Sequence, residues 1–434
     1  MTPTISVGIM FQPKISFLLD GNYHFAGQNY SGAHTVTCTN GLIELNGQSF
    51  EKLSFVPAGE DDTFVLKDVV IGINFHWERK EDQRFRGVLE FIVEDEKITA
   101  INTLPIDTYL ISVISSEMSA TSAIELLKAH TVIARSWLLS QIEKRQAIEI
   151  SDAEYISDTK TETEWIRWWD REDHKNFDVC ADDHCQRYQG ITRASQSLEA
   201  VTKAVSETSG EVITYLGAIC DARYSKCCGG IFEEFQNNWE PVAYPYMTKG
   251  CDWKGPDVPS VLPDLTQEAA AEAWIRSSPP AFCNTKDQAI LSQVLVSYDQ
   301  ETTQFFRWSV SYSTQALSDL IFRRTGIDFG TIKDLIPLER GTSGRIIRLK
   351  VVGSKRTMVI GKELLIRKAL SESHLYSSAF VVDKTSEGFL LTGAGWGHGV
   401  GFCQIGAAVM ATTGYDYRTI LAHYFQGSQL TKQY

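Results

Sequence analysis

The sequence predicts an α+β fold with a β-rich N-terminal region, a helix-bearing body and a second, mixed α/β lobe lining a cleft. Residues 1–100 alternate short apolar runs with Gly, Asn and Asp turn residues, which is typical of strands. Residues 118–143 contain neither Gly nor Pro and repeat apolar residues at helical spacing. Residues from about 252 to 390 mix the two patterns, so we expect them to form the second lobe.

The first half of the chain gives the clearest elements. We expect N-terminal strands at Ile5–Ile9, Val36–Cys38, Val65–Leu66 and Gly87–Val93. Ser122-Ala123-Ile124-Glu125 has the form of a capping box, so a helix is expected from Ala123 to Lys144. Glu117 would then lie in the connection just before that helix.

The later elements are spaced more widely. Residues 145–178 are polar with a Trp-rich centre at 165–169 and are expected to form a surface excursion. Helices are expected at Ser197–Thr208, Thr266–Ser277, Glu363–Ala369 and Gly406–Thr412, and strands at Glu211–Tyr215, Phe306–Tyr312 and Ile346–Val352. We therefore expect three parts, namely residues 1–252, residues 253–390 and a Gly/His motif at 391–434.

The composition restricts the partners. The chain has 434 residues, 43% of them hydrophobic, and a net charge of −13, which indicates a globular protein of two to three domains. Nucleic acid and anionic membranes are poor partners, because binding phosphates requires a surplus of Lys and Arg. No apolar run is long enough to span a membrane, and no signal peptide is visible at the N-terminus.

Four potential metal ligands lie within twelve residues: His174, Cys180, His184 and Cys185. Two thiolates and two imidazoles are a ligand set of tetrahedral zinc. Exposed His with inert Cys, or a disulfide between Cys180 and Cys185, would account for the same residues. Four protein ligands leave no position for water, so a zinc ion here would be structural. The other seven cysteines need not pair.

Three further features are chemically suggestive. Glu117 follows two serines; a carboxyl group in a partly apolar cleft suits a general acid, although a glutamate beside a helix start is more often a dipole partner. Residues 393–401 hold five glycines and His398, and without a following Lys-Ser/Thr they predict a close backbone approach and not a phosphate loop. Residues 227–230, Cys-Cys-Gly-Gly, indicate a tight bend more than a nucleophile.

Nine segments, taken in chain order, form a recognisable pattern: Leu104–Leu110, Ser116–Met118, Glu125–Ala129, Ala134–Ser136, Asp178–Tyr188, Ala204–Gly230, Trp239–Asp252, Gly395–Ala407 and Tyr417–Gly427. Together they resemble the SpoIID/LytB family, named for stage II sporulation protein D. The sequence departs from the family pattern at Ser119, His130, residues 225–228, residues 402–403 and Ile405. Several of these departures fall in the expected cleft.

The resemblance implies a lytic transglycosylase that cleaves peptidoglycan between N-acetylmuramic acid and N-acetylglucosamine and leaves 1,6-anhydro ends. The family's catalytic glutamate falls on Glu117, which would protonate the leaving oxygen and then deprotonate the sugar's own 6-hydroxyl. The resemblance places Arg135, His398, Gln404, Tyr224 and Lys128 around the substrate cleft. It also favours His174, Cys180, His184 and Cys185 as ligands of a structural Zn²⁺.

Two other functions are alternatives to the transglycosylase. The substitutions at 225–228 and 402–405 favour a second hypothesis, a glycan-binding activator of a cell-wall amidase with weak or no activity of its own. A zinc peptidase or amidase is disfavoured, because catalytic zinc keeps an open position and no H-E-x-x-H is present. We expect glycan strands stripped of their acidic stem peptides as substrate and an extracytoplasmic location, in the cell envelope or periplasm. Both a monomer and a homodimer remain open.

Overall fold

The computed structural model describes residues 2–72, 78–119, 121–151, 157–168, 174–182, 184–191, 198–253, 255, 261–294 and 302–434. It has the mixed α+β architecture that the sequence predicts. Contacts divide the chain into two compact units: Met1–Arg135 with Asp173–Glu211 and Lys432–Tyr434, and Ser136–Glu172 with Val212–Thr431. The boundaries expected near 252 and 390 both fall inside the second unit, because strands from residues 158–167 join strands from residues 332–361 in one sheet.

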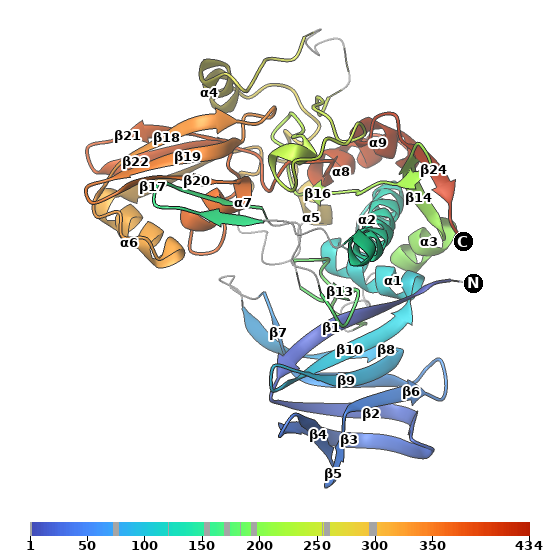
Figure 1. Cartoon of the computed structure of the whole chain (residues 1–434). Coiled ribbons are helices and arrows are strands. Elements are labelled where there is room, and N and C mark those ends of the chain that lie inside the picture. The colour runs from blue at the N-terminus through green and yellow to red at the C-terminus, as the bar shows by residue number, and fades with distance from the viewer. Residues whose placement is uncertain are drawn as a thin grey trace. The chain divides into compact units, whose positions relative to one another are not determined.

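A large antiparallel sheet forms most of the first unit, drawn in blue to cyan in Figure 1. Its strands are β1 (Thr4–Gln12), β2 (Lys14–Phe25), β3 (Gln28–Thr39), β4 (Leu42–Leu45), β5 (Gln48–Phe50), β6 (Lys52–Pro57), β7 (Thr63–Ile71), β8 (Arg79–Arg86), β9 (Val88–Glu94) and β10 (Lys97–Pro105), with β13 (Val179–Cys180) parallel to β1. All four strands expected in this region are confirmed. Buried residues alternate along β2, and Phe17 packs against Phe55 and Phe91 on the inner face.

Three helices complete the first unit: α1 (Ile106–Glu117), the start of α2 (Ile124–Ser151) and α3 (Leu198–Glu207). The apolar residues of α1 recur at helical spacing and are buried; they are Ile106, Tyr109, Leu110, Val113 and Ile114. The expectation that Glu117 lies in a connection is therefore wrong, because it is the last residue of α1. Helix α3 matches the expected helix, whose first residue, Ser197, lies outside the described residues.

Helix α2 begins one residue later than expected and continues to Ser151, well into the predicted surface excursion. Within that excursion, residues 158–160 form an exposed strand and residues 164–167 a partly buried one; Trp169 lies outside the described residues. In the part of the chain that the structure describes, no helix combines the length and the hydrophobicity that crossing a bilayer requires.

Two sheets and their helices form one half of the second unit. The first has the strand order β11 (Asp158–Lys160), β12 (Glu164–Arg167), β20 (Thr357–Gly361), β19 (Ile346–Gly353) and β18 (Ile332–Arg340). The second has the order β17 (Arg307–Ser313), β22 (Gly388–Ala394) and β21 (Phe380–Lys384). Helices α6 (Thr314–Thr325) and α7 (Glu363–Ala369) share a core with them that includes Trp308, Leu349 and Phe380.

The other half of the second unit contains short elements. They are β14 (Glu211–Tyr215), β15 (Ala218–Ile219), β16 (Tyr224–Ser225), the 3-10 turn η2 (Phe235–Asn237), α4 (Glu268–Arg276), α5 (Gln288–Val294), β23 (Phe402–Cys403), α8 (Gln404–Thr412), α9 (Tyr417–Tyr424) and β24 (Gln429–Lys432). Strand β16 pairs in parallel with β23, so residues 224–225 lie beside residues 402–403. The helices expected in this unit at 266–277, 363–369 and 406–412 are confirmed.

Candidate functional site

Glu117 ends α1 in a polar but buried environment. Its side chain is 9% exposed, and it forms no hydrogen bond or ion pair with any other residue that the structure describes. The hydroxyl groups of Ser112, Ser115 and Ser116 are buried, and they too lack a partner among the described residues. A carboxyl group with unused oxygens beside unused hydroxyl groups can donate to or accept from a bound polar ligand.

Arg135 has a structural role that the sequence did not reveal. Its side chain is fully buried, and its guanidinium donates to the Thr208 and Glu211 carbonyls (2.8 and 3.0 Å), to the Asp107 carboxylate (3.1 Å) and to the Tyr434 hydroxyl (3.0 Å). A side chain without exposed surface cannot contact a glycan. The expectation that Arg135 lines the cleft is therefore corrected: it holds together the elements around α1.

Lys128 is the expected cleft residue of the first unit that keeps some exposure. Its ammonium lies 2.8 Å from the Glu207 carboxylate and 3.1 Å from the Glu125 carboxylate, and thereby links α2 to α3. The hydrogen bond with Glu207 raises the pKa of Lys128. Lys128 is thus a charged residue already engaged by two carboxylates, and it stays a candidate for glycan contact.

Tyr224, His398 and Gln404 belong to the second unit and gather around the β16–β23 pair. The His398 Nε2 lies 2.8 Å from the Tyr224 carbonyl, and its Nδ1 accepts a hydrogen bond from the Val400 N–H at 3.0 Å. Burial, together with Arg223 and Arg345, lowers the pKa of His398 to about 3.

His398 is consequently neutral at pH 7, and backbone groups occupy both of its ring nitrogens. It is a positioning residue of this turn. Gln404 begins α8 and is 2% exposed. Tyr224 and His398 are both partly exposed.

The glycine run makes the close backbone approach that its sequence predicts. Gly399 has a φ of +75°, and a Cβ atom at this position would collide with the Arg345 guanidinium. That guanidinium donates to the Gly397 carbonyl at 3.1 Å. Glycine is therefore required at residue 399 both by its backbone conformation and by the buried arginine.

The four residues of the expected metal site come together in the first unit, with all their ligand atoms within 4.8 Å of one another. The Cys185 Sγ lies 3.4 Å from both the His174 Nε2 and the His184 Nδ1, and it accepts a hydrogen bond from the Cys180 N–H. The Cys180 side chain interacts with Cys185 and with both histidines, and these hydrogen bonds lower the pKa of the Cys180 thiol. We name this group the His/Cys cluster. Its donor set and its easily formed thiolate fit a soft divalent cation.

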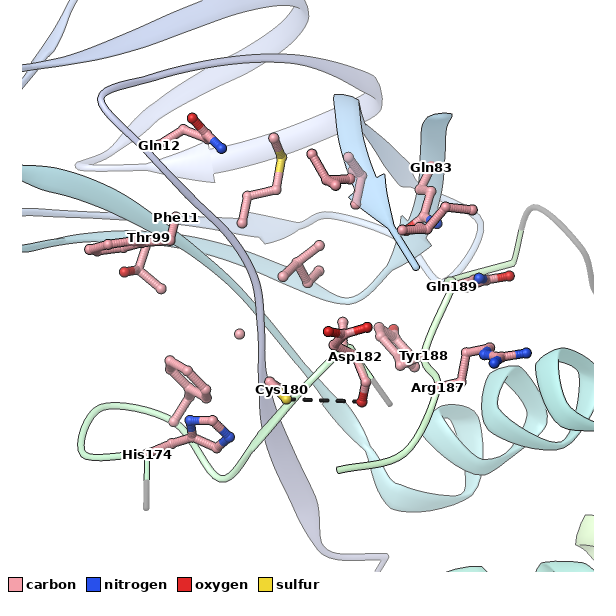
Figure 2. A pocket seen from close by; sticks show the side chains of 18 of the residues that line it. Phe11, Gln12, Gln83, Thr99, His174, Cys180, Asp182, Arg187, Tyr188 and Gln189 are labelled. Atoms are coloured by element: carbon pink, nitrogen blue, oxygen red, sulfur yellow. Dashed lines mark hydrogen bonds between the residues drawn. The ribbon is translucent and has the colours of Figure 1, made fainter. Parts of the chain in front are cut away.

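A cavity of about 730 Å³ borders the His/Cys cluster within the first unit. Figure 2 shows His174 and Cys180 along one side of it and Gln12 and Gln83 farther along its wall. Glu117 is not among the lining residues. The cavity is thus separate from the candidate acid and does not mark the place of its chemistry.

A second group of ligating side chains was not expected. Cys228, Asp252, Cys283 and Cys403 are all buried in the second unit, and their ligand atoms also lie within 4.8 Å of one another. We name this group the Cys/Asp cluster. Its members are too far apart along the chain for any spacing rule to connect them.

Comparison with known proteins connects the site to a family. The family model of the stage II sporulation protein, SpoIID, matches residues 94–215, which include Glu117 and the His/Cys cluster. A domain of unknown function, DUF8618, matches residues 233–401.

Three relatives extend over most of the chain. A protein of Brachyspira hyodysenteriae described as uncharacterized is 25% identical over 79% of this chain and 71% of its own length. Stage II sporulation protein D of Bacillus subtilis is 22% identical over 77% of this chain and 76% of its own length. The amidase enhancer of Bacillus subtilis is 26% identical over 74% of this chain, which corresponds to 40% of the relative.

Proposed function

Because the chain belongs to the SpoIID family, we propose that it acts on the bacterial cell wall as a lytic transglycosylase of peptidoglycan glycan strands. The observation that carries this proposal is Glu117, a buried carboxyl group at the end of α1 that no described residue engages. It lies inside the segment that the family model matches. A free carboxyl group in a protected position is what protonation of a glycosidic oxygen requires.

In the proposed reaction, Glu117 serves twice. It first donates its proton to the oxygen that leaves the muramic acid C1, while the glycosidic bond breaks. The resulting carboxylate then takes the proton of the 6-hydroxyl of the same sugar, whose oxygen forms the new bond to C1. An intramolecular acceptor replaces both the water and the second carboxylate of ordinary glycosidases, so a single glutamate is sufficient.

The charge of the chain supports stripped glycan as the substrate. A net charge of −13 repels the acidic stem peptides of intact peptidoglycan. Strands that an amidase has already freed of those peptides keep only the lactyl carboxylate of each muramic acid and so carry less negative charge. The similarity to an amidase enhancer favours a cell-wall amidase as the functional partner, and an extracytoplasmic site of action.

Mass spectrometry of digested glycan strands tests the reaction. Wild-type protein should release fragments with 1,6-anhydromuramic ends, and Glu117→Gln should lower their rate of formation by at least about 100-fold, because the amide cannot donate the proton. Glu90→Gln is the matched control: this carboxylate also lies in the first unit but pairs with Lys52 on the sheet, so the products should not change. If the wild type released only fragments with reducing ends, or if Glu117→Gln formed anhydro ends as fast as the wild type, the proposal would be excluded.

A second candidate function is a glycan-binding module that stimulates an amidase and has little chemistry of its own. The departures from the family pattern at 225–228 and 402–405 favour it, together with the similarity to the amidase enhancer. A pull-down with insoluble stripped glycan separates the two functions. Binding that survives Glu117→Gln, with no turnover by the wild type, would support the module over the enzyme.

The His/Cys cluster would hold a structural zinc ion in the same family segment. With His174, Cys180, His184 and Cys185 as ligands, four protein donors occupy a tetrahedral ion and no position remains for water. Bound there, zinc supplies no reaction chemistry and ties the 174–185 segment together. Chelation should then lower the unfolding temperature while folded protein remains active; immediate loss of activity without loss of fold would contradict a structural role.

A further inference from the structure

The Cys/Asp cluster is assembled from four separate segments of the second unit, and the proposed reaction uses none of its residues. Cys228 follows β16, Asp252 lies in the loop before α4, Cys283 follows α4 and Cys403 ends β23. Their exposed fractions are 3%, 0%, 1% and 0%. Three thiols and a carboxyl group, buried together, are an uncommon combination unless they share a ligand.

The distances suit a single ion. The Cys228 and Cys283 Sγ atoms are 3.7 Å apart. A tetrahedral ion with metal–sulfur bonds of about 2.3 Å places its sulfur ligands about 3.8 Å apart. A disulfide bond requires about 2.05 Å. An iron–sulfur cluster puts several iron and sulfide atoms between its thiolates and therefore separates them more widely.

Backbone and side-chain donors hold the ligand atoms in place. The Cys228 N–H donates to the Cys403 Sγ at 3.2 Å, and the Gly230 N–H donates to the Cys228 Sγ at 3.4 Å. The Asp252 carboxylate accepts from the Cys283 N–H at 2.9 Å and from the Tyr424 hydroxyl at 2.8 Å. Such outer contacts orient metal ligands and stabilise the thiolate form.

Buried cationic groups surround the cluster. Arg307 lies close enough to Cys228 and Cys283 to interact electrostatically with them, and it donates to the Gly229 carbonyl at 3.1 Å. Arg345 donates to the Cys228 carbonyl at 3.2 Å. Three thiolates and one carboxylate around a divalent ion carry a net negative charge, which these guanidinium groups offset.

We propose that Cys228, Cys283, Cys403 and Asp252 form a second, structural metal site that binds zinc. The ligand set is three soft sulfurs and one oxygen, all inaccessible to solvent, so the ion would have no open position for water. Two segments where the sequence departs from the family pattern, 225–228 and 402–403, meet at this site. The ion would fix the Cys-Cys-Gly-Gly bend against the β23–α8 junction.

Metal content of the purified full chain tests the site. With both clusters loaded, mass spectrometry of the metals should give two zinc ions per chain, Cys283→Ser should give one, and His184→Ala should give one. Cys220→Ser is the matched control, because this thiol is fully buried in the same unit but outside the cluster, and it should retain two. An unchanged zinc content in a folded Cys283→Ser variant would overturn the proposal.

A second measurement leaves all four ligands of the Cys/Asp cluster in place. In the His184→Ala background the Cys/Asp cluster is intact, so cobalt exchanged for zinc should show the strong sulfur-to-metal charge-transfer absorption of three thiolates. An octahedral spectrum without this absorption, or no bound cobalt, would overturn the proposal. So would a Cys228–Cys283 disulfide found by mass spectrometry after the free thiols are blocked.

The fourth ligand is tested separately, because Cys227 is also buried and adjacent to the cluster. Asp252→Asn should weaken zinc binding at least tenfold, measured by competition with a chromogenic chelator, whereas Cys227→Ser should bind zinc as the wild type does. The opposite result would assign the fourth position to Cys227 and overturn the role of Asp252.

Discussion

The two clusters reach similar ligand geometry by opposite routes along the chain. The His/Cys cluster lies within residues 174–185, whereas the Cys/Asp cluster joins residues that extend from 228 to 403. The first includes an exposed histidine and three partly buried ligands, and the second is buried throughout.

This difference predicts different contributions to stability. Closing a long loop costs the unfolded chain more entropy than closing a short one, so an ion that bridges distant segments contributes more to folding than one that closes a local loop. For spans of about 12 and about 176 residues, the difference amounts to about 2 kcal/mol. The Cys/Asp cluster should therefore be the stronger of the two structural ties.

The largest effect is expected from Cys403→Ser. Loss of this ligand should lower the free energy of unfolding of the second unit by at least about 5 kcal/mol. The binding energy of the ion is lost, and the remaining buried ligands are left without the positive charge that stabilises them. His184→Ala should cost the first unit about 2 kcal/mol less. Hydrogen exchange followed by mass spectrometry reports the two units separately. Equal losses would show that loop length does not govern these sites.

Arg135→Met tests how much a buried side chain stabilises the first unit by connecting segments that are distant in the sequence. Arg135 connects segments around residues 107, 208–211 and 434. Removing it should cost about 3 kcal/mol, because the Thr208 and Glu211 carbonyls lose their donor and the partly buried Asp107 carboxylate loses its cationic partner. Urea unfolding measures the loss. Arg84→Met, which removes an exposed pair with Asp20, should cost under about 1 kcal/mol.

The stability of the protein in acid tests the role of His398 in the Gly/His turn. The pKa of His398 is lowered to about 3, so between pH 6.5 and pH 3 the unfolded chain binds a proton that the folded chain does not. The contribution of His398 is complete above pH 6.5 and is lost on acidification by roughly 1 kcal/mol per pH unit. His398→Gln should flatten this dependence in metal-free protein; an unchanged slope would attribute it to other groups.

The smallest effect is expected from Lys128→Met. Its ion pairs with Glu125 and Glu207 are partly exposed, so the loss in stability should stay under about 1 kcal/mol. If Lys128 also contacts glycan, the Michaelis constant for stripped strands should rise while the unfolding curve stays nearly unchanged. A large loss of stability would instead make Lys128 a purely structural residue.

Local features of this chain could be predicted from its sequence, and non-local ones could not. The spacing of His174, Cys180, His184 and Cys185 indicated a candidate cluster, because these residues are near neighbours in the sequence, and the family resemblance favoured it over a Cys180–Cys185 disulfide. Cys228, Cys283 and Cys403 come together only through the pairing of β16 with β23 and the loop after α4, which no residue spacing records. The same limit hid the role of Arg135, whose partners lie up to 299 residues away.

Helix α1 shows a different limit. Its buried stripe has helical spacing, yet Ile106, Ile111, Val113 and Ile114 are β-branched and favour strands by intrinsic propensity. Packing against α3 and β10 decides the outcome. The apolar spacing after Pro105 was the available signal, and it would have placed Glu117 correctly at the end of a helix.

The first unit is assembled from pieces made at very different times. Residues 432–434 add the Tyr434 hydroxyl, which donates to Asp107 at 2.7 Å, and the Gln433 N–H, which donates to the Gly210 carbonyl at 2.8 Å. Synthesis from residue 211 to residue 434 takes about 10–45 s at ordinary translation rates. During vectorial synthesis, helix α1 and the Gly210 turn therefore gain these contacts only after residues 212–431 of the second unit have been made.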